Sequence, residues 1–577
     1  MSAEDATAAA SAPAERYAIG ISFGNSNSSI AHTTSEGKAA VIANEEGDRQ
    51  IPSILAYVEG EEYHGTQAKA QLVRNSKNTV AYFRDYLGKD FKSIDPTPAH
   101  ASAHPQEHQS TIAFSIKDTA SDEANTVTVS GIVTRHIRRL ASSASDYLGH
   151  KVNSAVITVP TDFTDRQREE LSAAAKEAGI DVLQFISEPV AAVLAYDARP
   201  QAKVTDKILV VADLGGTRSD VAVIASRGGI YSILATAHDY ELGGAQLDQV
   251  LIDYFAKEFI KKHKTDPREN ARSLAKLKLE AEATKRALSL GTTASFSVES
   301  LVDGIDYTST VNRTRYDLLA NKVFGQFTRL IEGAVQKAEL DVLDIDEVIL
   351  SGGTAHTPKI ASLLQNVFPE STTVLAPSTS PSAINPSELS SRGAAIQASL
   401  IQEFDKEDIE QSTHPVVTVT PHLSHAIGVL LITDDEKRGV FKPLLEAETA
   451  VPARRIAQFA APKNGGDVLI KICEGVREIK VTKPEPKSKK ATVEDDDDDS
   501  DLDSDDEDDE DEVREKVWKA GKVLAEAAVR GVKKGGKVEV TANIGPDLGL
   551  QFSAREVGGK GGVRGVVAPK ASENGSA

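Results

Sequence analysis

The segment from Ile208 to Ile224, which reads ILVVADLGGTRSDVAVI, constrains the fold more than any other stretch. Two apolar, β-rich runs flank Gly215 and Gly216, and this pattern predicts a β-hairpin with a tight glycine turn. Adjacent glycines carry no Cβ, so the backbone N–H groups of such a turn can approach an anion closely. Asp213 ends the first strand, where a carboxylate can organise the water shell of a metal ion. The segment therefore predicts a phosphate-binding turn.

A second segment, from Tyr17 to Ala31, repeats this pattern as a strand, Gly24 with small polar residues, and a strand. Two such hairpins in one chain indicate two related lobes that hold one phosphate chain between them. Each hairpin is followed by a series of short strands and helices. The first series runs from Tyr17 to about Gln201 and the second from Lys207 to about Leu400, which predicts two α/β lobes. The expected elements include strands at Ile54–Val58, Thr126–Val129, Ala155–Val159, Ile230–Ala237 and Glu347–Leu350, and helices at Arg166–Ala178, Gln246–Lys262 and Asn270–Leu290.

Short strands after residue 421 predict a small β-domain. The expected strands are Gly428–Ile432, Ile456–Ala461, Asp467–Cys473, Lys537–Ala542 and Leu548–Ala554. A Lys/Pro and acidic stretch, residues 483–512, is too highly charged to pack, so we expect a disordered insertion there. The segment Val513–Lys534 has partly helical spacing, which leaves open whether it packs on the β-domain, binds a partner or forms a local helix.

The charge of the chain is concentrated in one run. The net charge is −21, and residues 494–512 alone hold sixteen acidic residues, which leaves −5 for the rest. A folded part that is only mildly acidic gives no support to a direct nucleic-acid-binding groove. Ser500 and Ser504, within the run, precede acidic residues, as sites of acid-directed kinases do.

The single cysteine, Cys473, excludes an internal disulfide and a cysteine-based zinc site, which fits a reducing compartment. Residues 1–16 lack the basic start and apolar core of a secretory signal, and we expect them to form a disordered tail. No stretch approaches about 18 uninterrupted apolar residues, so no membrane span is expected. These features predict a soluble, intracellular protein.

Eight motifs resemble, in order and spacing, those of the seventy-kilodalton heat-shock (DnaK-like) chaperones. They read IGISFGNSNSSIA, ITVPTDFTDRQR, SEPVAAVLAY, ADLGGTRSDVAV, ELGGAQLD, EATKRALS, ILSGGTAHTPKI and INPSELSSRGAAIQ. One glycine motif alone would be a weak signal, whereas eight in family order are a strong one. The resemblance covers Tyr17 to about Leu400 continuously and extends more thinly into the β-domain.

The resemblance implies an α/β, actin-like, two-lobed nucleotide-binding domain over residues 17–408, with ATP in the cleft between the lobes. It also implies a linker over residues 409–421 and a β-sandwich, substrate-binding-like domain. The two parts of that domain would be residues 422–482 and 513–577, with the C-terminal tail in the second part. We do not expect the family's C-terminal helical lid, because Gly/Lys-rich residues follow the β-part.

Several residues differ from those that the family carries at the positions expected to contact phosphate. Family members carry a carboxylate in the first hairpin, where this chain has Ser22. The family lysine thought to orient the attacking water falls on Arg84, whose planar guanidinium is a poor substitute for a compact ammonium. In the second hairpin, Thr217 stands for a glycine and Arg218 for the phosphate-binding threonine.

Other positions of the family's nucleotide site persist, including the carboxylates of Glu188 and Asp213. The nucleotide-binding residues that the resemblance implies are Gly24, Asn25, Ser26, Asp213, Gly215, Gly216, Gly243, Gly244, Glu282, Lys285, Arg286, Ser289, Gly352, Gly353 and His356, the last in place of an arginine that stacks on adenine. Loss of one positioning group commonly costs about 10²–10³-fold in rate. We therefore expect ATP binding with slow or absent hydrolysis, and magnesium binding with part of its residues lost.

The linker carries Val416 and Val417 where the family has an acidic, leucine-rich segment, so the usual coupling between domains is not expected. With the altered pocket and the absent lid, this resembles the atypical branch of the family that occurs in the fungal ribosome-associated complex. That resemblance implies a cytoplasmic, ribosome-associated protein in a stable heterodimer with a zuotin-like J-domain protein. It further implies a role in folding nascent polypeptides by stimulating a separate, active heat-shock chaperone, without direct contact to nucleic acid or membrane.

Three functions remain open from the sequence. The favoured one is a co-chaperone subunit that binds ATP without hydrolysing it. The second is an active ATPase chaperone that cycles on unfolded clients, which Glu188 and Asp213 favour and Ser22, Arg84 and the missing lid oppose. The third is a phosphotransferase similar to sugar kinases, against which the appended β-domain argues.

Overall fold

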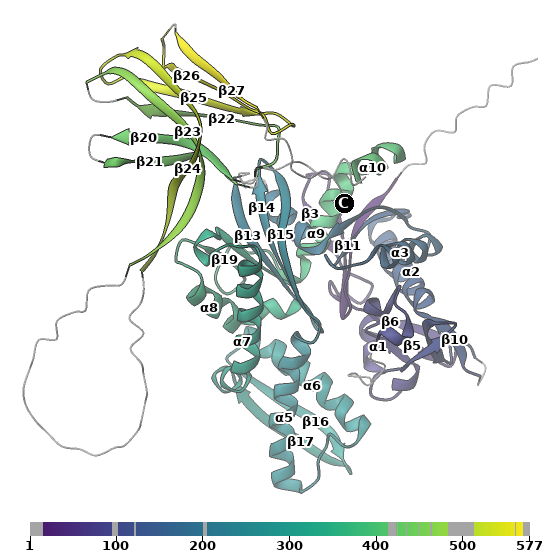
Figure 1. Cartoon of the computed structure of the whole chain (residues 1–577). Helices are drawn as coiled ribbons and strands as arrows, with labels where there is room; N and C mark the ends of the chain where they lie inside the picture. The colour runs from purple at the N-terminus through teal and green to yellow at the C-terminus, as the bar shows by residue number, and fades with distance from the viewer. Residues whose placement is uncertain are drawn as a thin grey trace, which may run out of the picture. The chain divides into compact units, whose positions relative to one another are not determined.

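The computed structural model describes residues 16–94, 102–120, 123–199, 205–413, 423, 425–433, 436–447, 449–461, 464–482, 513–559 and 561–568 (Figure 1). The chain forms two compact units. The first comprises Met1–Ser226 and Tyr231–Thr418, and the second comprises Arg227–Ile230 and Val419–Ala577.

The first lobe of the first unit is organised around a mixed sheet in the order β12-β11-β1-β2-β3, with β4 paired to β2. Strand β1 (Ala18–Phe23) runs parallel to β11 and antiparallel to β2, so it occupies the centre of the sheet. The other strands are β2 (Asn27–Thr33), β3 (Ala39–Ile42), β4 (Ile51–Pro52), β11 (Ser154–Val159) and β12 (Asp181–Ser187). The predicted hairpin near the start of the chain is confirmed by the pairing of Phe23 with Ser28.

Two small sheets and three helices complete this lobe. The sheets contain β5 (Ile54–Val58), β6 (Glu61–His64) and β7 (Thr79–Ala81), and β8 (Pro105–His108), β9 (Thr111–Ile116) and β10 (Asn125–Thr128). The helices are α1 (Gly65–Ala70), α2 (Val129–Leu148) and α3 (Asp165–Glu177). Helix α3 begins in a capping box, in which Thr164 accepts from the backbone N–H of Gln167 and the Gln167 side chain accepts from that of Thr164.

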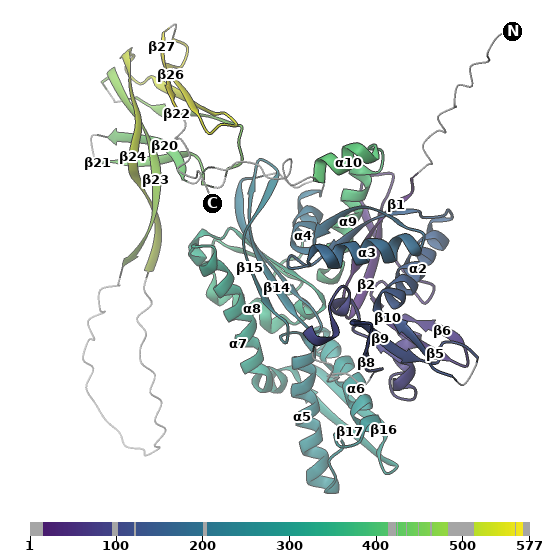
Figure 2. The same ribbon diagram turned by 45° about the vertical axis from the view of Figure 1, so that its right-hand side comes forward.

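The second lobe repeats the design with a sheet in the order β15-β14-β13-β18-β19. Asp213 pairs with Asp220 across the predicted hairpin, which confirms it. The strands are β13 (Lys207–Leu214), β14 (Ser219–Arg227), β15 (Ile230–Asp239), β18 (Glu347–Ser351) and β19 (Thr373–Leu375). The remaining elements are the hairpin β16 (Thr293–Val302) and β17 (Ile305–Asn312), and the helices α5 (Gly244–His263), α6 (Ala271–Leu290), α7 (Arg313–Lys337) and α8 (Pro358–Val367) (Figure 2).

Helices α4 (Glu188–Asp197) and α9 (Leu389–Ile401) tie the two lobes together at their base. Helix α4 leaves the first-lobe sheet and buries Ala192 and Tyr196 against strands of the second lobe. Helix α9 leaves the second lobe and packs on β1. The two helices also touch each other, since an added Cβ at Gly393 would lie 1.9 Å from the carbonyl oxygen of Ala191. Each lobe therefore carries a helix that belongs to the core of the other.

The second unit contains two four-stranded sheets, in the orders β21-β20-β23-β24 and β22-β25-β26-β27. They enclose one apolar core, to which Ile472, Val540 and Phe552 contribute. The strands are β20 (Ala426–Thr433), β21 (Glu436–Leu445), β22 (Ala453–Ala460), β23 (Gly466–Thr482), β24 (Val513–Val532), β25 (Lys537–Ile544), β26 (Leu550–Glu556) and β27 (Gly562–Val567). All elements described from Leu423 onward are strands.

Strand β24 overturns the reading of Val513–Lys534 as a local helix. It pairs with β23 from Val513 opposite Thr482 to Val532 opposite Gly466. Near its end the exposure alternates with period two, since Ala527 and Val529 are buried and Ala528 and Arg530 are exposed. The alanines and valines of this segment are compatible with a helix or a strand, and pairing with the long strand β23 makes it a strand. Strands β21 and β27 were not predicted either. Cys473, in the predicted strand Asp467–Cys473, is free and buried.

Helix α10 (Lys406–Thr413) covers the first residues of the predicted linker, 409–421. Ile409 is buried in a cluster with Leu183 and Ile401. Val416, Val417, the N-terminal tail and the acidic insertion with Ser500 and Ser504 lie outside the described residues. Across the described part of the chain, no helix combines the length and apolar character that a membrane crossing requires.

We predict that Gly393→Ala destabilises the first unit, because the added methyl group would collide with the backbone of α4 rather than with a flexible side chain. Overpacking of this kind typically costs about 1–3 kcal/mol. Thermal unfolding of the full-length protein measures the effect.

Gly333→Ala is the matched control, because a Cβ at Gly333, within α7, meets no atom within 4 Å. Alanine has the higher helix propensity, so this variant should match or exceed the wild type in stability by up to about 1 kcal/mol. A Gly393→Ala protein as stable as the control would contradict the close contact between α4 and α9.

Candidate functional site

A cleft of ≈ 450 Å³ lies between the two lobes of the first unit. It collects all but one of the residues that the sequence marked for the nucleotide site. The lining includes Ser22, Gly24, Asn25, Ser26, Arg84, Glu188, Asp213, Gly215, Gly216, Thr217, Arg218, Gly244, Glu282, Lys285, Arg286, Ser289, Gly352, Gly353 and His356. Gly243 lies directly behind this wall, where an added Cβ would be 2.8 Å from the backbone of Gly216.

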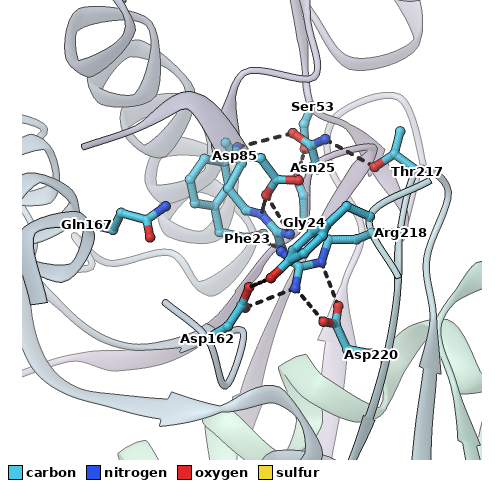
Figure 3. A network of polar contacts seen from close by, with 12 residues as sticks. Phe23, Gly24, Asn25, Ser53, Asp85, Asp162, Gln167, Thr217, Arg218 and Asp220 are labelled. Atoms are coloured by element: carbon cyan, nitrogen blue, oxygen red, sulfur yellow. Dashed lines mark hydrogen bonds and ion pairs between the residues drawn. The ribbon is translucent and has the colours of Figure 1, made fainter. Parts of the chain in front are cut away.

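The tips of the two predicted hairpins meet in this cleft. The side-chain amide of Asn25 donates to the hydroxyl of Thr217 at 3.1 Å (Figure 3). Ser26 lies against Gly216, where a Cβ would be 2.4 Å from the Ser26 hydroxyl oxygen. Within the described chain, the backbone N–H groups of Asn25, Ser26, Gly216 and Thr217 donate to no protein acceptor. Free amides on two facing turns form a site suited to an anion.

Glycine is required where the turns of the second lobe pack together. A Cβ at Gly244 would lie 2.8 Å from the hydroxyl of Thr354, and that hydroxyl donates to the Gly215 carbonyl at 2.8 Å. Gly352 has φ 84°, and a Cβ there would lie 2.5 Å from a carboxylate oxygen of Asp213. Any larger residue would displace the Asp213 carboxylate or the turn that carries it.

Arg84 is buried beneath the first hairpin and surrounded by acceptors. Its guanidinium lies 2.8 Å from a carboxylate oxygen of Asp85 and 3.2 Å from one of Glu188, and it donates to the Phe23 carbonyl at 3.3 Å. The side chain is only 5% exposed. A cation held in this way has most of its donors engaged by protein oxygens.

Arg218 is held in the same manner from the second hairpin (Figure 3). It pairs with Asp220 of its own lobe and, at 2.9 Å, with Asp162 of the first lobe. The guanidinium also lies over the Tyr240 ring, with 4.7 Å to the ring centre, and the Tyr240 hydroxyl donates to Asp162 at 2.8 Å. The Arg218 guanidinium therefore joins the two lobes.

Burial raises the pKa of Glu188 and of Asp213 in the folded protein. For Glu188, removal from water outweighs the nearby Arg84 guanidinium, and the negative charges of Asp213 and Asp220 add to the shift. For Asp213, burial is again the main cause, and the Asp220 carboxylate reinforces it. The cleft thus holds a group of carboxyls that retain protons more readily than ordinary ones.

The side of the cleft for which the sequence predicts nucleoside binding is polar and internally paired. The Lys285 ammonium donates to Asp248 and to the Gly244 carbonyl, each at 2.9 Å. Glu282 accepts from Lys69, which comes from the other lobe, at 2.6 Å. His356 contacts the Ser387 hydroxyl at 3.1 Å, and burial lowers the pKa of its imidazole. A neutral imidazole therefore lines this side of the cleft.

Sequence reasoning missed several residues of this site. Asp162 belongs to a motif that was recognised and Asp85 directly follows Arg84, but neither charge can be assigned to the site until its partner is known. Asp220 lies opposite Asp213 because the turn between the strands contains four residues, 215–218, whereas a two-residue glycine turn would place Arg218 there. Tyr240 and Lys69 carried no signal, since they reach the cleft only through the tertiary fold.

Comparison with known proteins places these observations in a family context. The family described as Hsp70 protein matches residues 18–485. A heat shock protein 70 homologue of Schizosaccharomyces pombe is 45% identical over 565 residues, which cover 96% of this chain and 97% of that protein. The ribosome-associated complex subunit SSZ1 of Saccharomyces cerevisiae is 44% identical over 552 residues, which cover 95% of this chain and 99% of SSZ1. Human heat shock 70 kDa protein 14 is 32% identical over 461 residues, covering 79% and 87% of the two chains.

The raised pKa values predict how stability depends on pH. Between the ordinary values of 4.5 for Glu188 and 3.8 for Asp213 and their raised folded values, the folded protein binds more protons than the unfolded chain. The free energy of unfolding therefore falls as pH rises through this window. We expect the melting temperature of the nucleotide-free protein to decrease from about pH 5 to about pH 8, and Glu188→Gln to flatten this slope. An equal slope in wild type and variant would contradict the assignment.

Proposed function

The chain belongs to the Hsp70 family, and we propose that it is an ATP-binding chaperone subunit with little or no ATP hydrolysis. Support for binding comes from the cleft, where two glycine-bearing hairpins present free backbone amides on one side of the cavity. The residues that the family resemblance assigns to adenosine line the same cavity. Nucleotide therefore has both a phosphate site and a nucleoside site in one cleft.

The pairing of Arg84 with Asp85 and Glu188 is the observation that best supports little or no ATP hydrolysis. Phosphoryl transfer depends on positioned charges and an oriented nucleophile rather than on covalent chemistry. Arg84 stands at the position of the family lysine, yet its guanidinium is bound to Asp85 and Glu188. The same contact occupies the carboxylate of Glu188, and Ser22 supplies no carboxylate from the first hairpin. Among the described residues, Arg84 and Glu188 are therefore engaged with each other and are not free to orient an attacking water.

We propose further that the chain acts in the cytoplasm as part of a ribosome-associated complex. The name of its yeast relative SSZ1 describes that protein as a ribosome-associated complex subunit. The partners of the present chain would be a zuotin-like J-domain protein in a stable heterodimer, the ribosome, a nascent polypeptide and a separate active heat-shock chaperone. The β-unit suits a polypeptide ligand, because strands β22 and β27 end one of its sheets and an extended segment can add to such an edge. Co-purification with the J-domain protein and co-sedimentation with ribosomes test this part.

The decisive experiment follows the fate of bound ATP. The purified protein is loaded with radiolabelled ATP and sampled over hours, with and without a J-domain. We expect ATP to stay intact and bound in both cases. Acceleration of hydrolysis by the J-domain would show that Ser22 and Arg84 are compensated, and the active chaperone that cycles on unfolded clients would then replace our proposal.

His356 provides a test of the nucleoside side. His356→Arg introduces the permanent cation of the family, and a cation over an aromatic ring contributes about 0.5–1 kcal/mol or more. We expect ATP to bind about two- to fivefold more tightly to this variant, measured by isothermal titration calorimetry. His356→Gln keeps a polar, uncharged side chain and should bind ATP as the wild type does. Equal ATP affinities of the His356→Arg and His356→Gln variants would show that residue 356 does not contact the adenine base.

A further inference from the structure

One face of helix α6 forms part of the wall of the cleft. Ser289 and Leu290 follow Arg286 by three and four positions, so the three side chains share this face, and all three line the cleft. Leu290 is 91% exposed, the highest value among the large apolar side chains of the described residues. An apolar side chain in the wall of a cleft is removed from water only when a ligand covers it.

The polar neighbours of Leu290 on this face already have partners within the protein. The Arg286 guanidinium pairs with the Glu282 carboxylate at 2.5 Å. The Ser289 hydroxyl donates to the Lys285 carbonyl at 3.2 Å. The surface that Leu290 contributes is apolar and needs no partner. A ligand can therefore cover Leu290 without breaking an existing hydrogen bond or ion pair.

A cap at the end of α6 fixes the position of Leu290. The Arg313 guanidinium, at the start of α7, donates to the Leu288 carbonyl at 2.8 Å and to the Ser289 carbonyl at 3.3 Å. It also donates to the Gly291 carbonyl at 2.7 Å. The last carbonyls of a helix lack partners within the helix, and a cation there also complements the helix dipole. One side chain thus holds the backbone on both sides of residue 290.

His356 lies within electrostatic reach of the same face of α6. Burial is the main cause of the lowered pKa of its imidazole, and the positive charge of Arg286 adds to the shift. A neutral imidazole and a leucine side chain both contact a flat ring through its faces rather than through a charge. This part of the cleft therefore suits an aromatic base better than it suits an anion.

We propose that Leu290 is a contact for the nucleotide base and packs against its ring face when ATP enters the cleft. The proposal rests on ATP binding as argued above, and it adds a residue that the family resemblance did not assign to the nucleotide. The faces of a purine ring are flat and largely apolar, so the base removes the exposed surface of Leu290 from water. Arg313 is a positioning residue, because it holds the end of α6 and does not line the cleft.

Leu290→Ser removes the apolar surface and leaves a small polar side chain. Since Leu290 is almost fully exposed, the melting temperature of the nucleotide-free protein should not change. We expect the ATP affinity of the full-length protein, measured by equilibrium dialysis, to fall about five- to tenfold. Leu290→Phe should bind ATP at least as tightly as the wild type, because an aromatic side chain stacks on a base.

Leu318→Ser is the matched control. Leu318 is 67% exposed in α7 and does not line the cleft. Its loss should leave ATP affinity within about twofold of wild type. A folded Leu290→Ser protein that binds ATP as tightly as this control would refute the contact. Absence of ATP binding by the wild-type protein would instead overturn the proposed ATP binding.

Tryptophan fluorescence tests the contact with the base directly. The chain has one tryptophan, Trp518, so the double variant Leu290→Trp, Trp518→Phe carries its single indole ring at the end of α6. We expect ATP to quench the emission of this variant, because the base stacks on the indole ring. The same background with Leu318→Trp should keep its emission. An unchanged signal at position 290 in a protein that dialysis shows to bind ATP would place the base elsewhere in the cleft.

Discussion

The neutralisation of two buried guanidinium groups governs the end of the cleft where the two hairpins meet. Arg84 and Arg218 each lie between two carboxylates, and one carboxylate of each set comes from a different part of the chain. A buried charge without partners would cost several kcal/mol. The carboxylates therefore fix where each guanidinium lies, and in doing so they fix the two hairpins that meet there. The carboxylates around Arg84 and Arg218 are therefore needed for the stability of the fold, whatever their role in function.

Both lobes depend on this arrangement and on the exchange of helices at their base. Helices α4 and α9 contact at Gly393, and Arg218 and Asp162 join the lobes at the phosphate end. Lys69 and Glu282 add a third link at the nucleoside end. The lobes are thus connected at three separate places within the nucleotide-binding unit.

Much of this could be predicted from the sequence, because the signals were local. The hairpins at Asp213 and Ser22, the helices α5 and α6, and most of the lining of the cleft follow from apolar periodicity, glycine turns and family motifs. The pairing of Arg218 with Asp162 could not be predicted, because fifty-six positions separate them and only the tertiary fold brings them together. Strand β24 was ambiguous for a related reason. Its alanines and valines are compatible with a helix or a strand, and only the pairing with β23 makes the segment a strand.

The contact of Arg218 with two aspartates also limits the evolution of this protein. A single substitution of Arg218 would leave Asp162 and Asp220 facing each other without a counter-charge, and a single loss of Asp162 would leave the guanidinium half paired. Breaking a buried ion pair from one side costs about 3–5 kcal/mol, whereas changing both sides together can cost far less. A change at one of these positions alone would therefore give a poorly stable protein. Since neither side of the contact tolerates change alone, we expect Arg218 and its aspartates to be substituted together or not at all.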